Sequence, residues 1–181
     1  GSVMALWGES SDLASLNSSG RADLATNSDT QTLRGSVAGP DLRVIFTIAE
    51  CPYRIIARRS AGIESLADLR GKRVATQLDS SAAYFLDLML RTAGLTSGNV
   101  TSVPFMAHTN SPISAVPDAI CSGKIDAVAL WEPQPQITKT LLGTDAIEFA
   151  DPAVYTEKFN LSTTQKNLDD RSEEHTSELQ S

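Results

Sequence analysis

The arrangement of apolar and polar positions predicts strands and helices that alternate along most of the chain. Short apolar runs bounded by glycine or polar residues predict strands, whereas apolar residues three or four positions apart predict helices. The strongest predicted helix, 80–93, has one apolar face formed by Ala82, Phe85, Leu86, Met89 and Ala93. The other predicted helices are 12–18, one that begins at Ser28 or Asp29, 65–70, 112–122 and 136–142. The predicted strands are 3–7, 22–26, 42–48, 53–59, 73–76, 100–105, 125–130 and 146–149.

The order of these elements predicts an α/β fold with two lobes. The β-α-β-α-β order in the first part of the chain is typical of a parallel sheet. We assign residues 1–52 to part of lobe one, and 62–150 to lobe two. Residues 53–61 read as a crossing strand or hinge between the lobes. From residue 151 to 170 no hydrophobic period holds, and we interpret this stretch as the start of a return segment.

A short motif, Ser-Gly-basic-x-Asp, occurs at 19–23 and again at 122–126. In both places small or apolar residues follow, and then polar residues. The glycine suits the end of a helix, and the apolar run suits a buried strand. Ligands in open α/β sheets bind at the carboxyl ends of the strands. The repeat therefore predicts two lobes that face each other, strand end to strand end, across a cleft.

Composition excludes several classes of partner. The 15 Lys and Arg residues against 22 Asp and Glu give a net charge of −7, so the chain has no basic footprint for nucleic acid or an anionic membrane. No apolar run approaches the roughly 20 residues of a membrane span, and no signal peptide pattern is present at the start. Two isolated cysteines, Cys51 and Cys121, argue against a cysteine-based metal site and leave open whether they pair.

The final segment, 171–181, differs in character from the rest. It resembles the in-frame translation of a sequencing adapter, and we interpret it as a non-native tail. His175 lies in this tail, so we expect no functional role for it.

Serines at the start of the strongest helix are the first candidates for ligand binding. Ser80 and Ser81 follow a predicted strand, and the start of a helix offers free N–H groups and a positive dipole end to an anion. Thr26, Asn27 and Ser28 end the equivalent strand of the other lobe and are predicted to donate hydrogen bonds across the cleft. Helix capping alone and turn chemistry alone also explain these residue types.

Three further candidates are larger side chains. Trp131 follows an apolar strand and is predicted to form a wall of the pocket, or else to pack between elements. Glu132 is expected to meet an amino group of the ligand or a hinge arginine, Arg58 or Arg59. Tyr53, at the crossing, either lines the cleft or packs in a core.

Together, the segments 19–25, 62–75 and 122–133 and the Ser80-Ser81 helix start resemble one family, the SsuA/THI5-like substrate-binding proteins of ABC importers. The resemblance implies a type II periplasmic-binding fold without catalytic activity or cofactor. It implies a monomer that captures a small polar or anionic organic solute, such as an aliphatic sulfonate, taurine or nitrate, between its two lobes. The partner implied is an ABC permease in the membrane, and the location is the periplasm or a cell-surface lipoprotein.

The resemblance also implies that the fold is incomplete. Members of the family begin with a strand and a helix that find no counterpart here, and they finish with a return crossing and closing helices. Two alternatives remain open. One is an enzyme of the THI5-like pyrimidine (thiamine precursor) branch, although its cysteine-rich metal motif is absent from this sequence. The other is the ligand-sensing domain of a transcription regulator.

Overall fold

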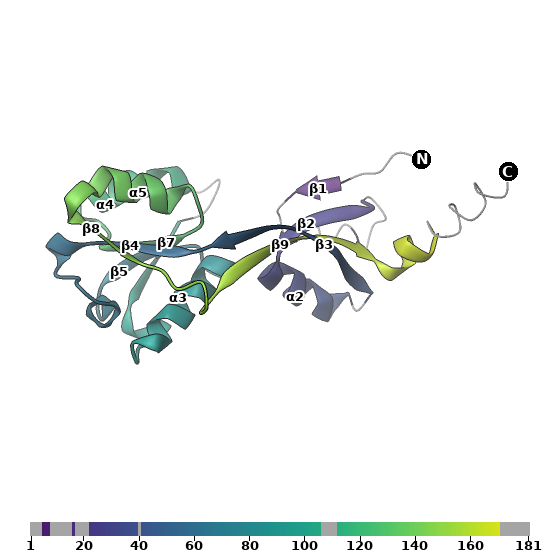
Figure 1. Ribbon diagram of the computed structural model, residues 1–181, viewed down its shortest axis with the longest axis horizontal. Helices are drawn as coiled ribbons and strands as arrows, with labels where there is room; N and C mark the ends of the chain where they lie inside the picture. The colour runs from purple at the N-terminus through teal and green to yellow at the C-terminus, as the bar shows by residue number, and fades with distance from the viewer. Residues whose placement is uncertain (1–4, 8–15, 17–21, 40, 106–111, 171–181) are drawn as a thin grey trace. The chain divides into compact units, whose positions relative to one another are not determined.

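The computed structural model describes residues 5–7, 16, 22–39, 41–105 and 112–170. The chain divides into two compact units, shown in Figure 1. Unit 1 contains residues 1–50 and 157–181, and unit 2 contains residues 51–156. The chain therefore leaves unit 1 once and returns to it, so both of its ends belong to unit 1. The predicted crossing segment, 53–61, contributes a strand to the sheet of unit 2.

The sheet of unit 1 has the strand order β1-β2-β9-β3. Its strands are β1 (Ala5–Trp7), β2 (Leu24–Ser28), β9 (Thr156–Thr164) and β3 (Leu42–Pro52), and helix α2 (Asp29–Ala38) follows β2. Strand β1 runs parallel to β2, whereas β9 runs antiparallel to it. The predicted parallel β-α-β-α-β sheet is therefore wrong in this unit, because β9 enters between β2 and β3. The buried residues of β9 include Ser162, Thr163 and Thr164, so no apolar period in the sequence marks this segment as a strand.

The sheet of unit 2 has the order β6-β5-β7-β4-β8. Its strands are β4 (Arg54–Arg58), β5 (Arg73–Thr76), β6 (Thr101–Pro104), β7 (Ala127–Leu130) and β8 (Ala146–Phe149). Strand β5 is parallel to both β6 and β7, and β4 is antiparallel to both β7 and β8. The central strands are apolar on both faces, which suits a sheet covered by helices on each side.

Helices cover both faces of this sheet. Figure 1 shows α4 (Val116–Cys121) and α5 (Gln134–Leu142) on one face and α3 (Ser81–Thr92) on the other. Helix α3 buries four residues of the predicted apolar face, namely Ala82, Phe85, Leu86 and Met89. Single 3₁₀ turns complete the unit at Arg59–Ala61, Leu66–Leu69, Ser97–Asn99, Ile113–Ala115 and Gly143–Asp145.

The two units differ in the size of their cores. Unit 2 contains one large cluster of buried apolar residues. Its members come from strands β4, β5 and β7 and from helices α3 and α4, among other segments. Among the described residues of unit 1, the buried apolar cluster contains Leu16, Ala22, Ala25 and Leu42. Buried apolar area is the main source of folding free energy, so we infer that unit 2 carries most of the stability of this chain.

One carboxylate joins three strands of unit 2. Asp126 directly precedes β7, and its Oδ2 accepts hydrogen bonds from the backbone N of Arg73 at 2.9 Å and from Arg73 Nε at 3.0 Å. Its Oδ1 accepts from Arg73 Nη2 at 2.7 Å and from Arg58 Nη2 at 3.1 Å. Arg73 Nη2 also donates to the carbonyl oxygen of Gly123 at 2.8 Å. Asp126 therefore fixes the start of β5 and β7 and the end of β4.

These contacts change the pKa of Asp126. Burial by itself opposes ionisation, but hydrogen bonds from the side chain and backbone of Arg73, with a further one from Arg58, outweigh it and lower the pKa from 3.8 to about 2. The folded-state pKa thus lies below the unfolded-state value. The stabilisation is complete above about pH 4 and is lost as the pH falls through about 2.

We predict that Asp126→Asn lowers the free energy of unfolding by about 3 kcal/mol at pH 7, because it leaves two arginines without their carboxylate. Urea unfolding followed by circular dichroism measures this loss. The difference from the original protein should narrow as the pH falls from about 4 to about 2. Asp87→Asn is the matched control, since Asp87 forms an exposed ion pair with Arg91 one helical turn away and should cost less than about 0.5 kcal/mol. Equal losses of unfolding free energy in Asp126→Asn and Asp87→Asn would contradict the stabilising role of Asp126.

Candidate functional site

The N-terminus of α3 is the best-defined candidate site in unit 2. Ser80 is the N-cap: its Oγ accepts a hydrogen bond from the N–H of Ala82 at 3.2 Å and donates to the carbonyl oxygen of Gln77 at 2.7 Å. The first intrahelical bond runs from the N–H of Tyr84 to the carbonyl oxygen of Ser80 at 3.1 Å. The first amides of a helix have no carbonyl partner within the helix, and its dipole is positive at this end.

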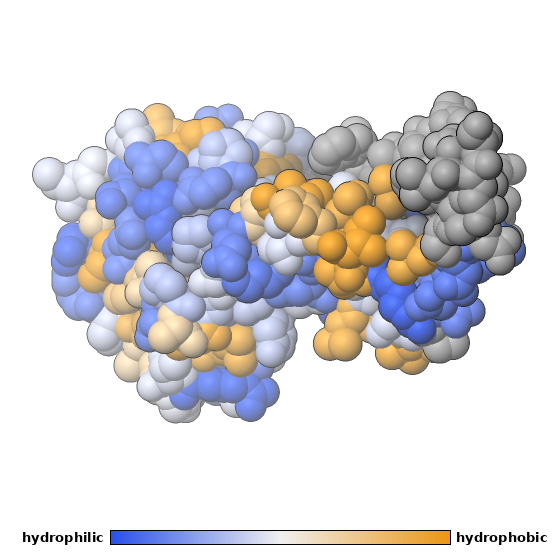
Figure 2. All heavy atoms as spheres, turned by 45° about the vertical axis from the view of Figure 1, so that its right-hand side comes forward, coloured by the Kyte–Doolittle hydropathy of each residue, from blue (hydrophilic) through white to orange (hydrophobic). Residues whose placement is uncertain are grey.

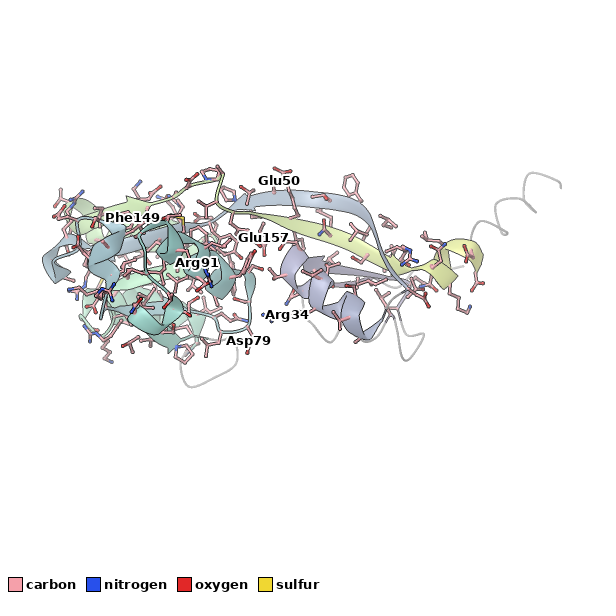
Figure 3. All side chains as sticks on the ribbon, turned by 90° about the horizontal axis from the view of Figure 1, so that it is seen from below. Arg34, Glu50, Asp79, Arg91, Phe149 and Glu157 are labelled. Atoms are coloured by element: carbon pink, nitrogen blue, oxygen red, sulfur yellow. The ribbon has the colours of Figure 1, made fainter. Side chains whose placement is uncertain are left out.

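The two predicted serines, Ser80 and Ser81, lie in different environments. The Ser80 hydroxyl is engaged in the cap, and Ser81 is 3 % exposed. An anion at this position would therefore meet backbone N–H groups more than serine hydroxyls. Asp79, just ahead of the cap, adopts a positive φ of 57° that turns the chain from β5 into α3 (Figure 3). Aspartate is among the residues that accept this conformation most readily.

The surroundings of this helix start combine polar and apolar groups. Leu78 and Tyr84 are nearly half exposed on either side of the cap. Thr76, the last residue of β5, is 1 % exposed, and its Oγ1 makes no hydrogen bond within the described part of the chain. The end of β5, close in sequence to the cap, thus contains a buried hydroxyl without a hydrogen-bond partner among the described residues.

Trp131 and Glu132 follow β7, which is the parallel neighbour of β5 in the sheet. Parallel strands end at the same edge of a sheet, so the residues after β7 and the start of α3 lie at the same carboxyl edge. Trp131 is partly buried and packs against the core of unit 2. The structure therefore brings Ser80, Ser81, Trp131 and Glu132 to one edge of one sheet, as the strand-end argument predicts.

The arginine partner of Glu132 differs from the one predicted from sequence. Arg54, not Arg58 or Arg59, forms the ion pair with Glu132, and its Nε donates to Glu132 Oε1 at 2.9 Å. The reason is the antiparallel register, which places Arg54 opposite Leu130 at the end of β7. Arg58 lies at the other end of β4 and binds Asp126, whereas Arg59 pairs with Glu64.

Arg54 extends this contact into a network. Its Nη1 donates to Glu148 Oε2 at 3.2 Å, and Lys139 Nζ donates to the same oxygen at 2.8 Å. The hydrogen bond from Lys139, opposed by burial and assisted by the charge of Arg54, lowers the pKa of Glu148. Glu132 Oε2 also accepts from the backbone N of Gln136 at 3.3 Å. The network fixes the turn between β7 and α5 that carries Trp131.

Tyr53 lies in an aromatic cluster in unit 2. It is 3 % exposed, and its ring centroid lies 5.4 Å from that of Phe85 and 5.8 Å from that of Tyr155. Tyr84 meets Tyr155 edge-on at 5.5 Å. This environment accords with the packing alternative for Tyr53, and its role as a ligand contact stays a prediction.

The remaining predicted residues, Thr26, Asn27 and Ser28, lie in unit 1. All three belong to β2 and are buried, because this strand extends two residues beyond its predicted end. Ser28 is also the N-cap of α2: its Oγ accepts from the N–H of Gln31, and Gln31 Oε1 accepts from the N–H of Ser28, both at 3.3 Å. Unit 1 thus repeats the strand, serine cap and helix of β5 and α3.

Sequence reasoning missed Arg54 and Tyr155. The signal for Arg54 was weak but present, since it is the second residue of the strand predicted at 53–59. Tyr155 stands in a stretch without hydrophobic period, so only the fold reveals its contact with Tyr53 and Tyr84.

Metal and membrane sites are not evident in the described ranges. No three or more His, Cys, Asp or Glu side chains there are grouped so that they could hold a metal ion. Nor does any helix in those ranges have the length and apolarity to cross a membrane. Cys51 and Cys121, both described, are not joined by a disulfide.

The fold is that of the periplasmic binding proteins. The sequence matches the NMT1/THI5-like family over residues 5–177, and the chain belongs to that family. A search of curated proteins found no match.

Three solved structures show the likeness. The alkanesulfonate-binding protein SsuA from Xanthomonas axonopodis pv. citri, bound to MOPS, has a TM-score of 0.68 and 22 % identity over 92 % of this chain and 66 % of its own. The periplasmic aliphatic sulphonate binding protein SsuA from Escherichia coli has a TM-score of 0.72 and 17 % identity. The match covers 93 % of this chain and 63 % of that protein. The zinc-bound ligand-binding component of an ABC-type import system from Staphylococcus aureus has a TM-score of 0.65 and 12 % identity. The match covers 96 % of this chain and 69 % of that protein. The chain thus spans about two thirds of their length.

We predict that Ser80→Ala lowers the free energy of unfolding by about 1 kcal/mol, because the N–H of Ala82 loses its capping acceptor. Ser80→Asp is the matched variant: it keeps an acceptor at the N-cap and adds a charge that the helix dipole favours, so its stability should change by less than about 0.5 kcal/mol. Urea unfolding at pH 7 measures both. If Ser80→Ala and Ser80→Asp lower the free energy of unfolding by the same amount, the stability does not depend on the hydrogen bond of the cap.

Proposed function

We propose that this chain is part of the solute-binding component of an ABC importer and that it captures a small polar or anionic organic solute, of the aliphatic sulfonate, taurine or nitrate kind. Membership in the NMT1/THI5-like family and the fold shared with two sulfonate-binding proteins support the proposal. The carrying observation is the start of α3, where a serine-capped helix begins at the carboxyl edge of a parallel pair of strands.

The proposed contacts follow from the chemistry of that edge. First-turn amides of α3 other than that of Ala82 bind the anionic group, and Ser80, which accepts a hydrogen bond from the N–H of Ala82, fixes the start of the helix. Trp131, kept in place by the Arg54–Glu132 ion pair in the turn that follows β7, contacts the organic part. Glu132 is nearly half exposed and is able to attract an amino group, as in an aminosulfonate.

Unit 1 is proposed to contribute through the polar residues at the end of β2. Ser28 caps α2 at the end of β2, as Ser80 caps α3 after β5. Thr26, Asn27 and Ser28 are the proposed contacts there, with Tyr53 of unit 2 completing the set. In α2 the N–H of Thr30 donates to Asp29 Oδ1 and that of Gln31 to Ser28 Oγ, so the proposed contribution of unit 1 is through side chains and not through backbone donors.

The proposed activity is equilibrium capture without chemistry. A monomer in the periplasm, or anchored at the cell surface, would deliver the solute to a membrane permease. Binding without turnover separates this proposal from an enzyme of pyrimidine synthesis. A helix-turn-helix segment in the parental reading frame would favour a regulator instead.

Titration calorimetry on the 181-residue chain tests the proposal with taurine, ethanesulfonate and nitrate, and with arginine as a cationic comparison. Replacement of Trp7 by Phe leaves Trp131 as the single tryptophan, so its fluorescence reports on the same titration. We expect saturable one-site binding of at least one anion and a change in Trp131 emission. Absence of saturation with all three anions, in a chain shown to be folded, would overturn the proposal for this chain.

We predict that Ser80→Asp weakens binding of the anion by at least tenfold while the protein stays as stable as the original. The added carboxylate would lie beside the first-turn amides and repel a second negative charge. Ser80→Thr, which keeps the hydroxyl, should bind within about twofold of the original. Calorimetry measures both affinities. An unchanged affinity in Ser80→Asp would show that the anion does not bind at the start of α3.

A further inference from the structure

Two exposed apolar residues of unit 2 flank the start of α3. Among the described residues of this unit, the exposed large hydrophobic side chains are those of Leu78, Tyr84, Ile137 and Leu141. Leu78 lies two residues before the cap and is 46 % exposed, and Tyr84 is the fourth residue of α3 and is 47 % exposed. Figure 2 shows that hydrophobic residues on the visible face of unit 2 form small groups between hydrophilic ones. The start of α3 thus combines amides that suit an anion with apolar side chains that suit an organic group.

The side chain of Tyr84 belongs to the first turn of α3. Side chains of a helix lean toward its N-terminus, so the surface that a residue covers lies over the turn before its own Cα. The N–H of Tyr84 donates to the carbonyl oxygen of Ser80 at 3.1 Å, which closes the first turn of the helix. Tyr84 therefore lies beside the amides of the proposed anion site.

Tyr155 fixes the orientation of the Tyr84 ring. The two ring centroids are 5.5 Å apart and the ring planes are at 87°, so the rings meet edge to face. Tyr155 is itself held, since its ring lies 5.8 Å from that of Tyr53 and 6.5 Å from that of Phe85, centroid to centroid. Its N–H also donates to the carbonyl oxygen of Asp151 at 3.3 Å. Tyr155 thus positions Tyr84 without covering it, because nearly half of Tyr84 is still exposed.

A buried hydroxyl at the same edge of the sheet is an independent sign of a ligand. Thr76 ends β5, the strand that leads into α3, and is 1 % exposed. Its Oγ1 forms no hydrogen bond within the described part of the chain. Buried polar groups are nearly always paired, since an unpaired one costs free energy. We therefore expect this hydroxyl to have a partner that the described residues do not provide.

We propose that Tyr84 and Leu78 are specificity residues of this site and that its preferred solute is an organic anion with an aromatic ring, such as an aryl sulfonate. This inference rests on the proposed function: it keeps the anionic group and changes the organic part from aliphatic to aromatic. The anionic group binds the first-turn amides, and the ring of the solute packs on the exposed part of Tyr84, with Leu78 on the other side of the cap. Because Tyr155 already fixes Tyr84, little side-chain entropy is lost on binding.

Titration calorimetry with matched anions tests the preference on the 181-residue chain. Benzenesulfonate and hexanesulfonate have the same anionic group and the same number of carbon atoms, and methanesulfonate has the anionic group with a minimal apolar part. We expect benzenesulfonate to bind at least about tenfold more tightly than methanesulfonate and about threefold more tightly than hexanesulfonate. Hexanesulfonate binding as tightly as benzenesulfonate would overturn the aromatic preference.

Variants of the flanking residues show which side chains carry the preference. We expect Tyr84→Ala to weaken benzenesulfonate binding by at least about tenfold and hexanesulfonate binding by about threefold or less. Tyr84→Phe keeps the ring and should bind benzenesulfonate within about twofold of the original. Leu78→Ala should weaken benzenesulfonate binding by about threefold. Leu141→Ala, at another exposed position of unit 2, is the control and should leave both affinities unchanged.

Urea unfolding of each variant checks that an altered affinity does not come from an unfolded chain. If Tyr84→Ala weakens both sulfonates equally, the ring of Tyr84 does not select the aromatic body and the inference is wrong. An unchanged affinity in Leu78→Ala would exclude Leu78 from the contact.

The same titrations separate this inference from the proposed function. If none of the sulfonates, taurine or nitrate binds to the folded chain, the proposed function fails and the inference fails with it. If nitrate, taurine or hexanesulfonate binds at least as tightly as benzenesulfonate, the anion site stands and the aromatic preference is wrong. Tighter binding of benzenesulfonate that is lost in Tyr84→Ala supports both.

Discussion

The contact between Asp126 and the guanidinium groups of Arg73 and Arg58 is the interaction on which unit 2 depends. Strands β4, β5 and β7 come from three separate parts of the chain and are joined by backbone ladders, and one side chain contacts all three at the same end of the sheet. Asp126 does so with both carboxylate oxygens, and Arg73 adds a bond to the carbonyl oxygen of Gly123. Because β5 and β7 are fixed at their starts, their carboxyl ends lie side by side, and the candidate site forms there.

This arrangement changes the meaning of the Ser-Gly-basic-x-Asp motif. The motif predicted a strand whose far end carries ligand groups, and β7 with Trp131 after it has that form. Its aspartate, however, serves the framework and lies at the opposite end of the strand from the candidate site. Gly123 has a positive φ of 73° at the end of α4, which is the glycine role expected at a helix end. In the copy at 122–126 the motif thus specifies how the strand is anchored, whereas residues 19–21 of the other copy lie outside the described ranges.

The accuracy of the sequence-based description follows from how local each signal is. Helix α3 and strands β5 and β8 were predictable within a residue or two, since their apolar periods and caps lie within the element itself. Strand β9 was missed because its buried positions include Ser162 and Thr163, which carry no hydrophobic period. The partner of Glu132 was assigned to the wrong arginine because register between β4 and β7 is a property of the pair of strands.

By itself, the sequence determined the α/β class, the serine-capped helices after β2 and β5, and the family resemblance, because these depend on short-range patterns of hydrophobicity and hydrogen bonding. Only the tertiary structure decided that β9 separates β2 from β3, that Arg54 holds Glu132, and that Tyr53 is buried against Phe85 and Tyr155. Each of these joins residues far apart in the chain. Their contacts arise from strand order and register, which the packing of the whole sheet selects and which no local segment encodes.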